Sequence, residues 1–262
     1  MFLPILPLGG LGGWLLLNRT LPAQTQAFEA SPTIRRDTDY FEARISQVTT
    51  AEELVADRRL LSVALGAFGL EDDINSQFLV RKVLESNPGD PRSLANSMTD
   101  ARYKQLSEAF RFGDTVFGPR VTESGFGAEI TAKFRARAFE AAVGEQDQSF
   151  RLAMNATREL AVMGREAQTD DTRWFRVLGT PPLRAVFEAA FGLPKGFGQL
   201  DIERQLDVFK EQAAKQLDLR SFDDFTDDAV REKLVQTYLV REQINSFNAL
   251  SPQSVALSLL QA

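Results

Sequence analysis

The chain has 262 residues, of which 44% are hydrophobic and 25% are charged, so it can bury one large core or two modest ones. Its 30 basic and 36 acidic residues give a net charge of −6, which argues against a nucleic-acid partner because phosphates require a basic surface. The sequence contains no cysteine and no histidine, which excludes disulfides, thiol nucleophiles, thiolate zinc sites and Ser-His-Asp arrangements.

The first 27 residues form an apolar segment that also contains glycine and proline. No Lys or Arg precedes the apolar run and no clean Ala-x-Ala site follows it, so we predict no cleavable signal peptide. Pro4, Pro7 and the glycines at 9, 10, 12 and 13 disfavour a helix over residues 1–17, and this run is short for a membrane span. We therefore interpret residues 1–27 as a flexible arm that packs on its own domain or on a neighbour, with a membrane or export role as the alternative.

Apolar side chains that a segment cannot bury by itself favour a partner surface. The arm is the only region in which residue chemistry alone suggests binding. The possible partner contacts are Phe2, Leu3, Trp14, Leu15 and Leu16.

From residue 28 onward, capping signals and helical spacing predict helices, and no stretch alternates in the way a strand requires. Thr50 and Glu53 form a capping box ahead of a helix over residues 54–68. Asn87-Pro88-Gly89 breaks the next helix, and Asp90-Pro91 predicts an N-cap followed by a proline in the first helical position. Thr99 or Asp100 then caps a further helix.

Residues 123–170 form a long central helical segment, in which Gly144 and Asp147 predict a bend or break. Beyond it, Thr180-Pro181 opens another helix, and Ser221 with Asp224 forms a second capping box. Ser251-Pro252 begins a last short helix. The predicted fold class is all-α, a multihelical array.

Residues 60–70 and 183–193 have similar sequences, and both predict a helix that ends in the same way. Each ends in Ala-Phe-Gly-Leu, which predicts a Schellman cap with the glycine in the left-handed conformation and the leucine folded back on the last turn. The matching pairs are Leu60, Val63, Ala67, Phe68, Gly69 and Leu70 with Leu183, Val186, Ala190, Phe191, Gly192 and Leu193.

Further matches follow each stop, shifted by a short insertion near residues 195–199. They pair Ser93, Asp100, Ala101, Leu106 and Phe110 with Ser221, Asp228, Ala229, Leu234 and Tyr238. We interpret the pattern as an internal duplication, with residues 28–122 and 171–262 as two helical repeats packed as one globular unit. Two unrelated helices that share a stop are the alternative.

The polar residues predict no catalytic, cofactor or metal site. Adjacent aspartates, as at 72–73, 170–171, 223–224 and 227–228, point about 100° apart on a helix and fit capping better than acid–base chemistry. The acidic run 218–232 lacks the central glycine of a calcium loop. The basic pairs Arg35-Arg36 and Arg58-Arg59 are interpreted as solvated helix surface.

Several ordered motifs resemble the alphaproteobacterial family known as domain of unknown function 1217. They are DTDYF at 37–41, ELVADRRL at 53–60, AFGL at 67–70, RKVLES at 81–86, SLAN at 93–96, DARY at 100–103 and AFRF at 109–112. The opening, with Met1-Phe2, Pro7-Leu8, Gly13-Trp14 and Arg19-Thr20, resembles the short members. The resemblance implies a multihelical fold and genes that tend to lie among flagellar genes, and it implies no catalytic residue.

From this resemblance we expect a non-enzymatic, flagellum-associated protein, either cytoplasmic or in the flagellum itself. It would act in flagellar assembly, export or structure by contacting flagellar structural or export proteins. The alternative is a small-molecule-binding or hydrolytic protein with an inter-repeat cleft, in which Arg102 and Glu108 face Arg231 and Glu242. A third possibility is peripheral membrane attachment through residues 1–17.

Overall fold

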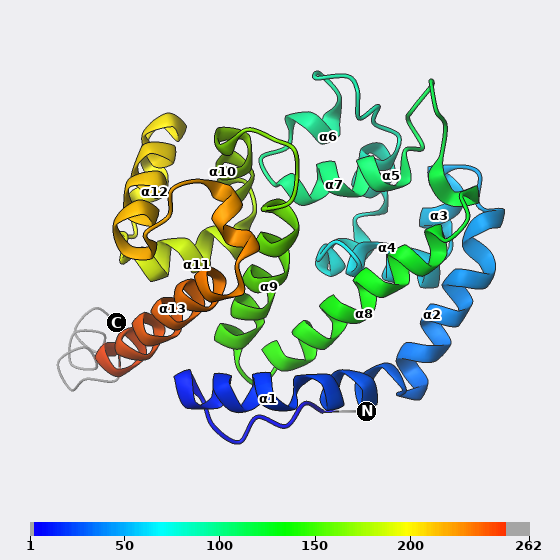
Figure 1. Ribbon diagram of the computed structural model, residues 1–262. Helices are drawn as coiled ribbons and strands as arrows, with labels where there is room; N and C mark the ends of the chain where they lie inside the picture. Colours follow the sequence, from blue (N-terminus) through cyan, green and yellow to red (C-terminus); the bar gives the residue numbers. More distant parts are fainter. Residues whose placement is uncertain (1–2, 250–262) are drawn as a thin grey trace, which may run out of the picture. The chain divides into compact units, whose positions relative to one another are not determined.

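The structure is a computed structural model that describes residues 3–249 (Figure 1). These residues form thirteen α-helices and five short 3-10 turns and no strand, so the predicted all-α class is confirmed. The α-helices are α1 (Gly10–Glu29), α2 (Pro32–Arg44), α3 (Ala51–Ala56), α4 (Arg58–Gly66), α5 (Gln77–Leu84), α6 (Leu94–Ser97), α7 (Ala101–Phe110), α8 (Phe126–Gly144), α9 (Gln148–Met163), α10 (Asp170–Leu178), α11 (Pro181–Phe191), α12 (Ile202–Leu217) and α13 (Asp228–Ala249). The helix predicted at Ser251-Pro252 lies outside the described residues. No helix within residues 3–249 combines the length and the apolar character needed to cross a membrane.

The chain divides into two compact units. Unit 1 contains Met1–Ile5 and Thr20–Ala142, and unit 2 contains Leu6–Arg19 and Val143–Ala262. Helix α1 therefore contributes residues 10–19 to unit 2 and residues 20–29 to unit 1. That the two predicted repeats pack as one globular unit stays a prediction.

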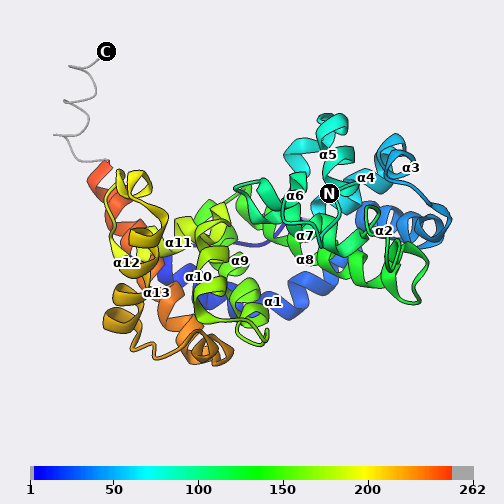
Figure 2. The same cartoon turned by 90° about the horizontal axis from the view of Figure 1, so that it is seen from above.

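In unit 1, helix α4 packs against α2 and α3, and α5 packs against α3, α6 and α7 (Figures 1 and 2). Its core consists mainly of aliphatic residues with several phenylalanines, and Phe41, Leu61, Leu106, Phe110 and Ile130 are fully buried. The predicted capping box is present: the Thr50 hydroxyl accepts a hydrogen bond from the Glu53 amide, and the Glu53 carboxylate accepts one from the Thr50 amide. Asp100 caps α7, as predicted.

Two helix boundaries predicted in this unit are wrong. The single helix expected over residues 54–68 is broken at Asp57, which has an extended backbone. Its carboxylate accepts hydrogen bonds from the amides of Arg59 and Leu60, so Asp57 ends α3 and caps α4. Asp90-Pro91 opens a turn and not a helix, because Asp90 bonds the amides of Arg92 and Ser93, and α6 begins only at Leu94.

In unit 2, helix α11 packs against α9, α10, α12 and α13, and α10 also packs against α12 (Figures 1 and 2). Aromatic rings dominate this core. Trp174 makes edge-to-face contacts with Phe187, Phe209, Phe222 and Phe225, at centroid distances between 5.0 and 6.2 Å. The predicted break between α8 and α9 is present, with Asp147 as the N-cap of α9. Thr180-Pro181 opens α11, and the Ser221–Asp224 capping box opens a 3-10 turn at Phe222–Thr226.

The N-terminal segment differs from the prediction of a flexible arm. A helix begins at Gly10 and continues through Pro22 to Glu29. Residues 3–9 are not helical, as the prolines and glycines predict for residues 1–17, but residues 10–17 are. The apolar face of this helix supplies the energy that offsets the poor helix propensity of its glycines and proline, because Trp14 and Leu17 are buried in unit 2 and Phe28 in unit 1. Gln24 anchors the preceding chain in unit 1 by bonding both the amide and the carbonyl of Ile5.

Both predicted Schellman caps are present. Gly69 and Gly192 have φ of +71° and +65°. The amide of Leu70 bonds the carbonyl of Leu65 at 3.0 Å, and the amide of Leu193 bonds that of Glu188 at 2.9 Å. These are the long closing bonds that define the motif.

Candidate functional site

The predicted partner contacts of the N-terminal segment have different environments. Leu3 and Leu15 are exposed, at 60% and 55%, and stay available to a partner. Leu16 is half-buried. Trp14 is buried: its ring lies 6.0 Å from that of Phe150, and its indole nitrogen donates to Glu232, so it is not a surface contact. Phe2 lies outside the described residues.

Three of the four charged residues of the predicted cleft are held by partners inside their own units, and the fourth, Glu242, is half-buried in unit 2. In unit 1, Arg102 binds the carboxylate of Asp100 at 2.7 Å and also the Gly69 carbonyl, while Glu108 pairs with Lys104. In unit 2, Arg231 is buried and binds Asp228 and the Phe225 carbonyl. Each guanidinium therefore stabilises a local turn or helix start. Among residues 3–249, no three acidic side chains lie close enough together to hold a metal ion.

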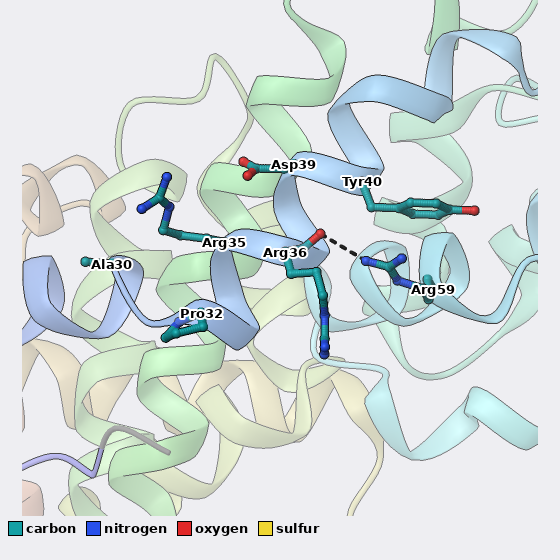
Figure 3. Close-up of a pocket in the computed structure, with 7 residues that line it drawn as sticks. All are labelled: Ala30, Pro32, Arg35, Arg36, Asp39, Tyr40 and Arg59. Atoms are coloured by element: carbon teal, nitrogen blue, oxygen red, sulfur yellow. Dashed lines mark hydrogen bonds between the residues drawn. The ribbon is translucent and has the colours of Figure 1, made fainter.

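The strongest candidate site is a surface on unit 1 where arginines from two helices meet. Arg35 and Arg36 come from α2, and Arg58 and Arg59 from the first turn of α4; we call these four residues the α2–α4 arginine face. They line two neighbouring shallow depressions of about 560 and 490 Å³, which share Arg36 and Arg59. Figure 3 shows the residues that line the first of them. The depressions lie on the surface where α2 packs against α4.

Local contacts fix the position of Arg59 within this face. Its guanidinium donates to the backbone carbonyl of Arg36 at 3.0 Å, as Figure 3 shows, and lies 3.9 Å from the centre of the Tyr40 ring. It also lies 3.4 Å from the carboxylate of Asp37. These contacts connect the start of α4 to α2, so the side chain of Arg59 is held in place within the face.

Tyr40 and Asp57 form a second fixed element beside the arginines. The Tyr40 hydroxyl donates to the Asp57 carboxylate at 2.6 Å. This hydrogen bond is the main cause of a raised pKa of Tyr40, since it stabilises the neutral phenol. Partial burial tends to raise the pKa of Asp57, but hydrogen bonds from Tyr40 and from the amides of Leu60 and Arg59 outweigh it and hold that pKa below its ordinary value.

The other three arginines are exposed, and one of them, Arg36, is paired with a carboxylate. In Figure 3, Arg35 and Arg36 leave α2 in different directions. The side chain of Arg36 is 69% exposed and lies 3.6 Å from Asp37. Arg58 donates to the neutral side chain of Asn75, and within residues 3–249 it has no ion pair. Arg35 is exposed, and no ion pair to it occurs among the described residues. The guanidiniums of Arg35 and Arg58 thus have no carboxylate partner among the described residues, and that of Arg36 is largely exposed although it is paired with Asp37.

The sequence contains a signal for this site in its two Arg-Arg pairs. Their composition predicts solvated helix surface, and both pairs are exposed. What the sequence could not supply is that α2 and α4 pack together and bring the two pairs onto one surface.

Comparisons with known proteins address the fold and the family. The family described as protein of unknown function, DUF1217, matches residues 67–230. The crystal structure of protein AGR_C_984 from Agrobacterium tumefaciens is similar in fold, with a TM-score of 0.74 and 20% sequence identity; the similarity covers 93% of this chain and 99% of that one. No curated protein matches the sequence.

The family match extends over more than half of the chain and ends in the first turn of α13. It includes the Schellman caps at Gly69 and Gly192, whereas the arginine face at residues 35–59 precedes it. The resemblance inferred from the ordered sequence motifs is thus confirmed: this chain belongs to the DUF1217 family of proteins of unknown function.

Proposed function

We propose that the protein is a non-enzymatic, flagellum-associated protein that acts in flagellar assembly, export or structure through protein–protein contacts. The observation that supports the contact role is the α2–α4 arginine face. Arginine and tyrosine are enriched at protein interfaces, where they contribute much of the binding energy. Small-molecule sites, in contrast, are concave and bury most of their ligand, and these two depressions are shallow.

The flagellar part of the proposal rests on the family resemblance and on the gene neighbourhood that it implies. This support is associational and assigns no residue to a flagellar partner. The exposed apolar side chains of Leu3 in unit 1 and Leu15 in unit 2 are further candidate contacts, each on its own unit. Within this proposal the protein works in the cytoplasm or at the flagellum.

The alternative of a small-molecule or hydrolytic cleft receives less support. It requires free charged groups, and Arg102 and Arg231 are each held by a carboxylate and a backbone carbonyl within their own units. Replacing those partners with a ligand would cost the buried Arg231 its hydrogen bonds.

Deletion of the gene, with motility and flagellar ultrastructure scored together, tests the proposed function. We expect poor swimming and absent or truncated flagella, restored by expression of the wild-type chain. Normal swimming with normal flagella would contradict the flagellar role. If the flagellar role holds, detection of the protein in isolated hook–basal bodies or sheared filaments would indicate a structural role, and its absence from both would indicate a cytoplasmic one.

A further inference from the structure

The α2–α4 arginine face has a charge character opposite to that of the whole chain. The protein carries a net charge of −6, yet four arginines line the two depressions against two aspartates, Asp37 and Asp39. Asp37 is already engaged by Arg36 and Arg59. Asp39 is exposed one helical turn after Arg35 (Figure 3). The uncompensated charge of the face is therefore positive.

The geometry of the exposed arginines indicates the shape of the ligand. Adjacent residues on a helix point about 100° apart, and the guanidiniums of Arg35 and Arg36 diverge accordingly (Figure 3). Arg58 adds a third cation from α4, in the depression that does not contain Arg35. Cations spread in this way do not close around one small anion, but they can each meet a different carboxylate of an extended chain.

We propose that the α2–α4 arginine face binds an extended acidic segment of a partner protein, with successive Asp or Glu carboxylates paired to Arg35, Arg36 and Arg58. This inference rests on the proposed protein–protein function and names the chemistry of the partner. Arg59, Tyr40 and Asp57 act as positioning residues, because their mutual contacts hold α2 and α4 in the arrangement that presents the three exposed cations.

The test is a binding measurement on the intact chain by fluorescence anisotropy. The probe is a labelled synthetic peptide of alternating glutamate and serine, about 12 residues long and thus able to span about 40 Å when extended. The same peptide with glutamine in place of glutamate is the neutral control. We expect the wild type to bind the glutamate peptide, to ignore the glutamine peptide and to lose affinity as salt is added.

Two triple variants with the same change in net charge locate the site. The first is Arg35→Gln, Arg36→Gln and Arg58→Gln. The matched control is Arg92→Gln, Arg204→Gln and Arg220→Gln, three exposed arginines outside the face. We expect the face variant to bind the glutamate peptide about tenfold more weakly or worse, and the control variant to stay close to the wild type. All six side chains are exposed, so circular dichroism should report unchanged helicity in both.

Three results of the binding experiment would overturn the proposed acidic ligand. Equal weakening in both variants would mean that net charge alone attracts the peptide, and failure of the wild type to bind would remove the acidic ligand. If inorganic pyrophosphate at the same concentration as the glutamate peptide displaces that peptide, the face is a small-anion site and not a site for an extended segment. Normal flagella in the deletion strain would overturn the flagellar function but leave the peptide result unaffected, so the two failures are distinguishable.

Discussion

At the scale of single residues, Trp174 belongs to the aromatic core of unit 2. It is 2% exposed and contacts four phenylalanines edge to face. We expect Trp174→Ala to lower the free energy of unfolding by about 3–5 kcal/mol, from lost burial and from the cavity left behind. Trp174→Phe should cost less because one ring remains. Urea titration followed by circular dichroism measures both, and a loss below about 1 kcal/mol for the alanine variant would show that the cluster collapses around the gap.

The left-handed glycine at the end of α11 allows a clean test of backbone strain. Gly192 has φ of +65°, and a Cβ placed there would meet only Arg241, at 3.5 Å. Gly192→Ala should therefore lower the free energy of unfolding by about 1 kcal/mol through conformation alone. Gly192→Asn should lower it less, because asparagine tolerates this conformation. Equal thermal stability of the wild type and the alanine variant would contradict the cap as the source of stability.

Asp57 links the stability of the arginine face to acid pH. Its pKa is lowered in the folded state, so the ionised carboxylate stabilises the fold above its ordinary pKa, and this contribution is lost as pH falls through the folded value. Asp57→Asn keeps an acceptable helix cap but removes the ionisation. We expect the variant to be less stable near neutral pH and to lose less further stability in acid.

Urea midpoints measured between about pH 2 and 6 test this, since both the ordinary and the lowered pKa of Asp57 bear on that interval. Asp39→Asn is the control, because it removes an exposed carboxylate from α2, the helix that packs on α4. Parallel pH curves for the wild type and Asp57→Asn would show that Asp57 does not contribute to the acid dependence.

At the scale of elements, local sequence signals predicted where helices begin and end better than whether a helix runs unbroken between those points. The caps at Thr50, Asp100 and Gly192 depend on residues within one turn, and the structure contains all three. The break at Asp57 was missed because its cause is partly tertiary: Tyr40, from another helix, holds the Asp57 side chain. The arginine face was missed for the same reason, since it exists only when α2 packs on α4.

In helix α1, side-chain packing outweighs low helix propensity. Glycine and proline disfavour a helix, but the burial of Trp14, Leu17 and Phe28 outweighs that cost. Gly13 also has a positive role, because a Cβ there would lie 1.9 Å from the carbonyl oxygen of Leu8. The close passage of residues 6–9 over the start of α1 therefore needs a glycine at this position.

Neighbouring glycines in α1 should respond oppositely to alanine. Gly13→Ala must push residues 6–9 away, so we expect faster amide hydrogen exchange in that segment and lower stability. At Gly12 a Cβ would meet nothing within 4 Å, so Gly12→Ala should be neutral or stabilise by up to about 1 kcal/mol through helix propensity. Similar exchange patterns in the two variants would contradict the close contact.

Across the whole molecule, the two units contain corresponding pairs of packed helices. In unit 1, α4 packs on α2 and α3, and α3 also packs on α5. In unit 2, α11 packs on α9 and α10, and α10 also packs on α12. Leu106 and Phe110 of α7 are buried, as are Leu234 and Tyr238, their sequence counterparts in α13. These parallels favour the internal duplication, which stays a prediction.

The unfolding of the two units can be followed with different probes. Both tryptophans, Trp14 and Trp174, belong to unit 2, so tryptophan fluorescence reports the unfolding of that unit, whereas far-ultraviolet circular dichroism follows the helices of both. Leu61 is fully buried in the core of unit 1, and Leu61→Ala should destabilise that unit by about 2–5 kcal/mol.

In urea, helicity of the Leu61→Ala variant should then fall in two steps, while the fluorescence midpoint stays at the wild-type value. If fluorescence and circular dichroism shift together in one transition, the two units unfold as a single cooperative body, as the sequence prediction of one globular unit requires.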